Sequence, residues 1–255
     1  MFGRRSARRR NAALDAPFPD DWRALLARKW PTFSQLSDDE RARLEDLVKV
    51  FLVDKRWEAS NGFAITDEMR VLIAAMACLL VLERNYEDFR NVDWIVVSPE
   101  AVRERGAVGV GIGDVVSTGL AYSGLAQPDS GAVLVAWDAA RYEARHPSRG
   151  ENVVFHEFAH KLDMLDGFAD GAPPMPGGLF AERWTRVCTD VYERIRAGEG
   201  DGVLRDYAGV DPAEFFAVAT ETFFTVPHRL AAEHDELYSL LAEYYRQDPR
   251  TRVPE

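Results

Sequence analysis

The sequence predicts an α+β fold that is mostly helical and contains one small β-sheet. Residues 20–90 and 150–250 place apolar side chains at helical spacing, whereas residues 91–140 contain short β-branched runs separated by glycine. Helices first, strands in the middle and helices last are typical of this class. We expect residues 1–19 to form a flexible Arg-rich N-terminus and residues 20–255 a single domain.

The helices of the N-terminal part carry their own start signals. Residues 21–30 form one predicted helix that stops before a proline. Ser37 opens a second one, because Glu40 three residues later completes a capping box. Thr66 caps a third, whose run VLIAAMACLLVL (71–82) is apolar on every face and therefore predicts a fully buried helix.

The middle of the chain is predicted to form strands and the C-terminal part helices. The strands are expected at 92–99, 107–114 and 131–137. Turn residues and proline then separate four predicted helices. They are expected at about 152–165 (stopped by Gly167), 179–198, 211–226 (begun by Asp211 and Pro212) and 232–246.

Composition excludes several function classes. The formal net charge is −11, and the first ten residues carry five arginines, so residues 11–255 carry −16. Such an acidic body argues against nucleic-acid binding, which needs clustered basic side chains. The longest apolar run, at residues 71–82, is too short to span a membrane, and the Arg-rich start lacks an apolar export segment. With two cysteines and no CxxC spacing, we expect a cytoplasmic protein without membrane partners.

One short motif, H156-E-F-A-H160, predicts a metal site. Residues four apart lie on one face of a helix, so His156 and His160 can each offer an imidazole nitrogen to one ion. Glu157 then stands beside the ion as a general base for a water molecule. This HExxH arrangement is typical of zinc metalloproteases and predicts one Zn²⁺ per chain.

The residues by themselves leave the third protein ligand open. Asp166 lies six positions after His160, where some zinc proteases have their third ligand, but Asp163 replaces the glycine that would turn the chain back to the ion. The other zinc protease class takes a glutamate from a later helix. Glu214 and Glu221 are both candidates, although Glu214 also sits where it could cap its own helix.

Three stretches resemble a known family. HEFAHKLDMLDG, the segment Y207-A-G-V-D-P-A-E214-F-F-A-V-A and YYRQDP (244–249) are similar to the Mlc titration factor A family of zinc metallopeptidases, from about residue 20 to the C-terminus. The Tyr-x6-Glu segment also resembles the catalytic domain of anthrax lethal factor. The resemblance implies a zincin-like domain with its small sheet beside the HExxH helix. It also implies that Glu214 is the third ligand and that Tyr207 lines the active site.

The expected function is zinc-dependent hydrolysis of peptide bonds with Glu157 as general base and Tyr207 as an oxyanion donor. The resemblance adds aminopeptidase-like activity. It also implies an alternative, a regulatory protein that binds a transcriptional repressor of the Mlc type controlling the glucose phosphotransferase system. Position 218, where thermolysin-like enzymes orient a zinc-bound histidine, is Val, so this task falls to Asp163 or Glu221.

Overall fold

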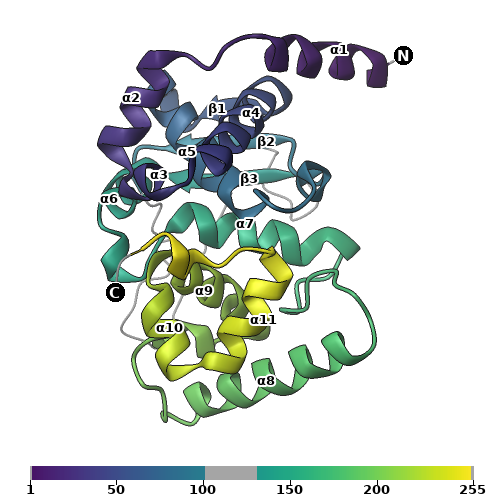
Figure 1. Ribbon diagram of the computed structural model, residues 1–255, viewed down its shortest axis with the longest axis vertical. Coiled ribbons are helices and arrows are strands. Elements are labelled where there is room, and N and C mark those ends of the chain that lie inside the picture. Colours follow the sequence, from purple (N-terminus) through teal and green to yellow (C-terminus); the bar gives the residue numbers. More distant parts are fainter. Residues whose placement is uncertain (1, 101–130, 254–255) are drawn as a thin grey trace. The chain divides into compact units, whose positions relative to one another are not determined.

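The computed structural model describes residues 2–100 and 131–253, and these fall into two compact units. The first unit is Met1–Arg145 and the second is His146–Glu255 (Figure 1). The described chain is mostly helical with one small sheet, which confirms the α+β class. The single domain at 20–255, and the place of the sheet beside the HExxH helix, stay predictions.

The first unit combines helices with the sheet. Its longer helices follow the predicted boundaries closely, because their caps are local. Its elements are α1 (Phe2–Asp15), α2 (Asp20–Lys29), α3 (Pro31–Gln35), α4 (Asp38–Asp54), β1 (Arg56–Ala59), η1 (Ser60–Gly62), α5 (Asp67–Leu80), η2 (Tyr86–Phe89), β2 (Trp94–Ser98), β3 (Ala132–Ala136) and α6 (Trp137–Arg145).

Both predicted caps of this unit are formed. The Ser37 side chain accepts from the Glu40 backbone N–H, and Glu40 accepts from Ser37 N at 2.9 Å, so the capping box is reciprocal. Thr66 Oγ1 accepts from Met69 N at 3.3 Å. Residues 71–82 are buried without exception, as expected for a helix that is apolar all round.

The sheet has three parallel strands in the order β1-β2-β3. Strands β2 and β3 match the predicted 92–99 and 131–137, while the predicted strand 107–114 lies outside the described residues. The sequence does not predict strand β1, because apolar residues keep helical spacing as far as Trp57. Helix α4 in fact stops at Asp54, and Trp57 pairs with Ile95 of β2. Four residues are too few to show a period of their own.

The N-terminal segment forms helix α1 and contacts the rest of its unit. Arg10 binds Asp54 at 2.6 Å and Glu87 at 2.5 Å, and its guanidinium lies 5.2 Å from the centre of the Tyr86 ring. Lys49 Nζ donates to the carbonyl oxygen of Leu14 in α1 and to that of Ala16 just after this helix. The flexibility expected of residues 1–19 stays a prediction, whereas the helix over Phe2–Asp15 was not predicted from the sequence.

The regular secondary structure in the described residues of the second unit is helical, and loops connect the helices. It contains η4 (Pro147–Arg149), α7 (Val153–Asp163), η5 (Met164–Asp166), α8 (Leu179–Arg196), η6 (Asp206–Gly209), α9 (Pro212–Thr225), α10 (Pro227–Glu233), α11 (Asp235–Tyr245) and η7 (Pro249–Thr251). The four predicted helices correspond to α7, α8, α9 and α11. The predicted stop at Gly167 is also present, with the glycine in the left-handed region at φ 98°.

Helix α9 is the core of this unit. From Phe215 to Thr225 every residue is buried, and Figure 1 shows α7, α10 and α11 beside this helix. Phe155 of α7 packs on Phe224 with ring centres 5.4 Å apart, and Phe223 packs on Tyr245 of α11 at 5.7 Å. The first of these aromatic contacts holds α9 against α7, and the second holds α9 against α11. Helices α7 and α9 carry the predicted site.

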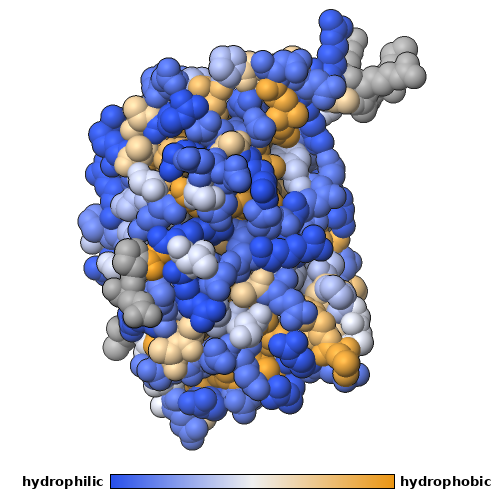
Figure 2. Space-filling view, in the orientation of Figure 1, coloured by the Kyte–Doolittle hydropathy of each residue, from blue (hydrophilic) through white to orange (hydrophobic). Residues whose placement is uncertain are grey.

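The exposed face in Figure 2 is mostly hydrophilic, with apolar side chains in separate patches. Among the described residues, helices are too short or too polar to cross a membrane.

Candidate metal centre

Helix α7 carries the two histidines, and its N-terminus is capped. The Asn152 side chain accepts from Val154 N and Phe155 N, which caps the helix. The apolar side chains of α7 are buried on the other faces, and this leaves one face for His156 and His160. Their ring centres lie 4.8 Å apart, and the two Nε2 atoms are 3.2 Å apart.

Helix α9 brings Glu214 to the same point. Pro212 occupies the first helical position, and Asp211 caps the helix by accepting from Glu214 N at 2.9 Å. The Glu214 carboxylate faces the histidines: its Oε2 lies 3.0 Å from His156 Nε2 and 3.5 Å from His160 Nε2. The backbone N–H of Glu214 thus donates to the capping residue Asp211, while the Glu214 carboxylate points to the two histidines.

The three facing atoms have the spacing that a tetrahedral metal ion requires. Ligands about 2.0–2.1 Å from a zinc ion are separated by about 3.3–3.4 Å along the tetrahedron edge. The observed separations are 3.0, 3.2 and 3.5 Å. Within the described part of the chain, this is the group of side chains able to hold a metal.

The chemistry of the donor set also fits a cation. Glu214 Oε2 is buried and satisfies no hydrogen bond among the described residues. Burial alone would raise the pKa of Glu214, but the neighbouring His156 and His160 overcome this and hold it well below its usual range. Burial likewise lowers the pKa of His156, yet Glu214 and Glu221 together raise it to about 10. The site therefore favours a positive charge at its centre.

Glu157 lies next to the first histidine, where burial raises its pKa, against the opposing effect of His156 and His160. A carboxylate with a raised pKa is a better proton acceptor near neutral pH than an exposed one. Glu157 is thus a carboxylate with a raised pKa directly after the first histidine of the cluster.

The two aspartates that follow the motif accept hydrogen bonds from backbone N–H groups of the loop after α7. Asp166 lies in η5, and its Oδ1 accepts from Phe168 N at 3.1 Å, so it stabilises the turn at Gly167. Asp163 is fully buried, and its Oδ2 accepts from Gly171 N at 2.9 Å. The structure does not bring Asp166 into the cluster of facing ligand atoms.

Comparisons with known proteins identify the family of the chain. The profile of the glucose-regulated metallo-peptidase M90 family matches residues 4–246. The chain belongs to this metallopeptidase family. It is 33% identical to an uncharacterized protein of Synechocystis over 94% of this chain and 89% of that one. It is 30% identical to Mlc titration factor A of Cronobacter sakazakii (95% and 90%) and 31% identical to that of Salmonella typhimurium (92% and 89%).

The resemblance inferred from the sequence is therefore confirmed, and membership of a metallopeptidase family implies a bound metal. In this M90 member, Tyr207 is carried by η6 and lies beside His156. Its ring centre lies 6.2 Å from that of His156. Burial and the nearby Glu214 raise the pKa of the Tyr207 hydroxyl, so it stays protonated and able to donate a hydrogen bond.

The structure also identifies contacts of His156 that sequence reasoning found only in part. Its Nδ1 lies 2.7 Å from Glu221 Oε1, which selects Glu221 over Asp163 as the carboxylate facing this histidine. Arg205 in turn donates to Glu221 at 2.5 Å. The signal for Glu221 was its seven-residue spacing from Glu214, whereas no pattern pointed to Arg205, a single arginine in a loop.

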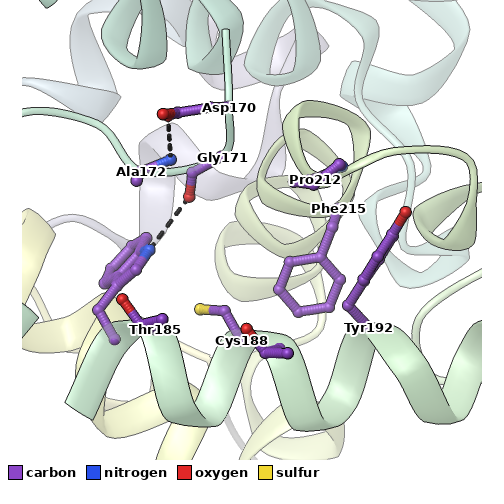
Figure 3. A pocket seen from close by; sticks show the side chains of 10 residues that line it. Asp170, Gly171, Ala172, Thr185, Cys188, Tyr192, Pro212 and Phe215 are labelled. Atoms are coloured by element: carbon purple, nitrogen blue, oxygen red, sulfur yellow. Dashed lines mark hydrogen bonds between the residues drawn. The ribbon is translucent and has the colours of Figure 1, made fainter. Parts of the chain in front are cut away.

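A pocket of about 170 Å³ lies near the start of α9, between α8 and the loop that follows η5 (Figure 3). Gly171 is at its rim, and the Gly171 carbonyl accepts from Trp184 Nε1 at 3.1 Å. Burial raises the pKa of the Cys188 thiol in this pocket to about 12, so the thiol stays protonated and is a poor nucleophile. The lining consists of Asp170, Gly171, Ala172, Trp184, Thr185, Cys188, Thr189, Tyr192, Pro212 and Phe215.

Proposed function

We propose that the protein is a zinc-dependent peptidase in which His156, His160 and Glu214 hold one zinc ion. The observation that carries this proposal is the convergence of two imidazole nitrogens and a buried carboxylate oxygen that satisfies no hydrogen bond within the described residues. A zinc ion bound there supplies Lewis-acid activation of water and of the peptide carbonyl. Membership of a metallopeptidase family supports the same reaction class.

The protein's own groups supply the proton transfers. Glu157 accepts a proton as water adds to the scissile carbonyl carbon, and it delivers that proton to the leaving amine as the C–N bond breaks. The raised pKa of Glu157 suits both steps. Tyr207 donates a hydrogen bond from its hydroxyl to the carbonyl oxygen, where negative charge develops. We infer an aminopeptidase-like preference from the resemblance to the family.

The experiment that tests the proposal is peptide hydrolysis by Glu157→Gln, which keeps the size of the side chain and removes the base. We expect turnover to fall by about 10²–10⁴-fold, with one zinc per chain retained. Glu243→Gln, at an exposed position of α11, is the matched control and should keep full activity. Unchanged turnover in Glu157→Gln would remove the general base from the mechanism.

The aminopeptidase preference needs a separate comparison of substrates. A peptide with a free N-terminus should be cleaved at its first bond, and its N-acetylated form should be inert. Equal hydrolysis of both peptides, or cleavage at internal bonds, would indicate an endopeptidase.

A second proposed function is binding of a transcriptional repressor of the Mlc type. The support is the name of two relatives, Mlc titration factor A. Co-elution of Glu157→Gln with a purified repressor in size-exclusion chromatography tests it. Co-elution by this variant would mean that binding needs no catalysis, and no complex with either wild type or variant would exclude the function. The cytoplasmic location expected from the sequence stays a prediction.

A further inference from the structure

The side of His156 that faces away from the metal ligands contacts a buried carboxylate. Glu221 Oε1 lies 2.7 Å from His156 Nδ1, and the Glu221 side chain is only 1% exposed. When Nδ1–H donates to this oxygen, the lone pair of the neutral imidazole is on Nε2, the atom that faces Glu214 and His160. The contact therefore selects the tautomer and ring orientation that a metal ligand needs.

Both oxygens of Glu221 have partners. Oε2 accepts from the backbone N–H of Asn152, the capping residue of α7, at 2.7 Å. Oε1 accepts from Arg205 Nη2 at 2.5 Å in addition to facing His156. One carboxylate on α9 thus binds the first turn of α7, its metal-facing histidine and a cation. Such an arrangement offsets the cost of burying the charge.

Arg205 connects this network to the segment that carries Tyr207. It is the residue directly before η6, and its guanidinium carbon lies 5.8 Å from the centre of the Tyr207 ring. The remaining terminal nitrogen, Nη1, is 3.7 Å from Glu151 Oε1. Arg205 therefore contacts the Glu221 carboxylate and the Tyr207 ring at the same time.

We propose that Glu221 and Arg205 are positioning residues: Glu221 orients His156 toward the metal, and Arg205 holds Glu221 and the Tyr207 segment in register with it. This inference rests on the metal site of the proposed function. It adds two residues that touch neither the metal nor the substrate, and it assigns each of them a measurable effect.

Zinc affinity, measured by competition with a chromogenic chelator, tests the role of Glu221. Glu221→Gln keeps an oxygen for His156, but its amide group then faces the Asn152 N–H, a second donor. We expect the zinc affinity to fall about 10–100-fold. Thr220→Val is the matched control. Thr220 lies in α9 next to Glu221, and this substitution removes its buried hydrogen bond to Tyr245 of α11, not a contact with His156. An affinity within threefold of wild type in Glu221→Gln would overturn the proposal.

A double-mutant cycle tests whether Arg205 acts through Glu221. Arg205→Ala alone should weaken zinc binding by at least about threefold, and it should add little in the Glu221→Gln background. Equal factors in both backgrounds would show that the two residues act independently. Since Arg205 is one-third exposed, its variants can be measured even if Glu221→Gln does not fold.

Hydrogen exchange tests the link to Tyr207 without using activity. The Ala208 and Val210 amides are bonded to the Arg205 and Tyr207 carbonyls, so loosening of η6 should speed their exchange in Arg205→Ala. Arg205→Lys should restore part of the protection, and unchanged exchange would refute this link. If wild type binds zinc and the cycle holds but no peptide is cleaved, the proposed function fails and the positioning inference stands.

Discussion

The replacement of Gly171 by alanine perturbs the metal site from a distance. Gly171 has φ +74°, and a Cβ placed on it would lie 2.2 Å from the carbonyl oxygen of Pro212 and 2.7 Å from the carbonyl carbon. Both contacts are with backbone atoms, which cannot rotate away. Pro212 begins α9 two residues before Glu214, so the start of α9 or the loop must move.

The cost has two parts. A non-glycine residue in the left-handed region costs about 1–2 kcal/mol. Overpacking against a fixed backbone adds about 1–3 kcal/mol. We therefore expect Gly171→Ala to lower the free energy of unfolding by about 2–5 kcal/mol. Zinc affinity should fall by at least about tenfold, because the Glu214 carboxylate is displaced from the two histidines.

Gly167→Ala is the control from the same loop. Gly167 also has a positive φ, of +98°, but a Cβ there would meet nothing within 4 Å. It should cost only the backbone part, about 1–2 kcal/mol, and leave zinc affinity unchanged. Urea unfolding in the presence of a chelator measures the stability, and chelator competition measures the affinity. Equal losses in the two variants, within about 0.5 kcal/mol, would refute the reasoning.

Three further predictions concern the same unit. Zinc should stabilise the wild type by about 2.7 kcal/mol at 100 times its Kd, and a chelator should remove this gain in a thermal melt. Glu214→Ala should lose stoichiometric zinc, whereas Asp166→Ala should keep it; metal analysis showing the reverse would exchange the two assignments. Burial raises the pKa of Asp163 from 3.8 to about 6, so the folded state binds this proton more tightly than the unfolded state. The free energy of unfolding of the metal-free protein should therefore fall by about 3 kcal/mol as the pH rises from about 3 to about 7, with most of the loss between about pH 4 and 6. Asp163→Asn should abolish that loss in urea titrations at each pH, and an unchanged pH profile would exclude Asp163 as its source.

The sequence by itself determined the features that depend on near neighbours. The caps at Ser37 and Thr66, the stop at Gly167 and the shared face of His156 and His160 all follow from residues within about one helical turn. The M90 relationship was also predictable, since its motifs are contiguous. Periodicity failed for β1, whose conformation depends on pairing with β2 and not on its own four residues.

Only the tertiary structure decided which distant groups meet His156. From the residues alone, Asp166, Glu214 and Glu221 were all possible partners of the motif. The packing of α9 on α7 brings Glu214 to one side of the His156 ring and Glu221 to the other. It also brings Arg205 to Glu221 from a loop that has no pattern to read. The physical reason is that helical spacing determines which residues share a face, whereas contacts between helices depend on how their buried side chains pack.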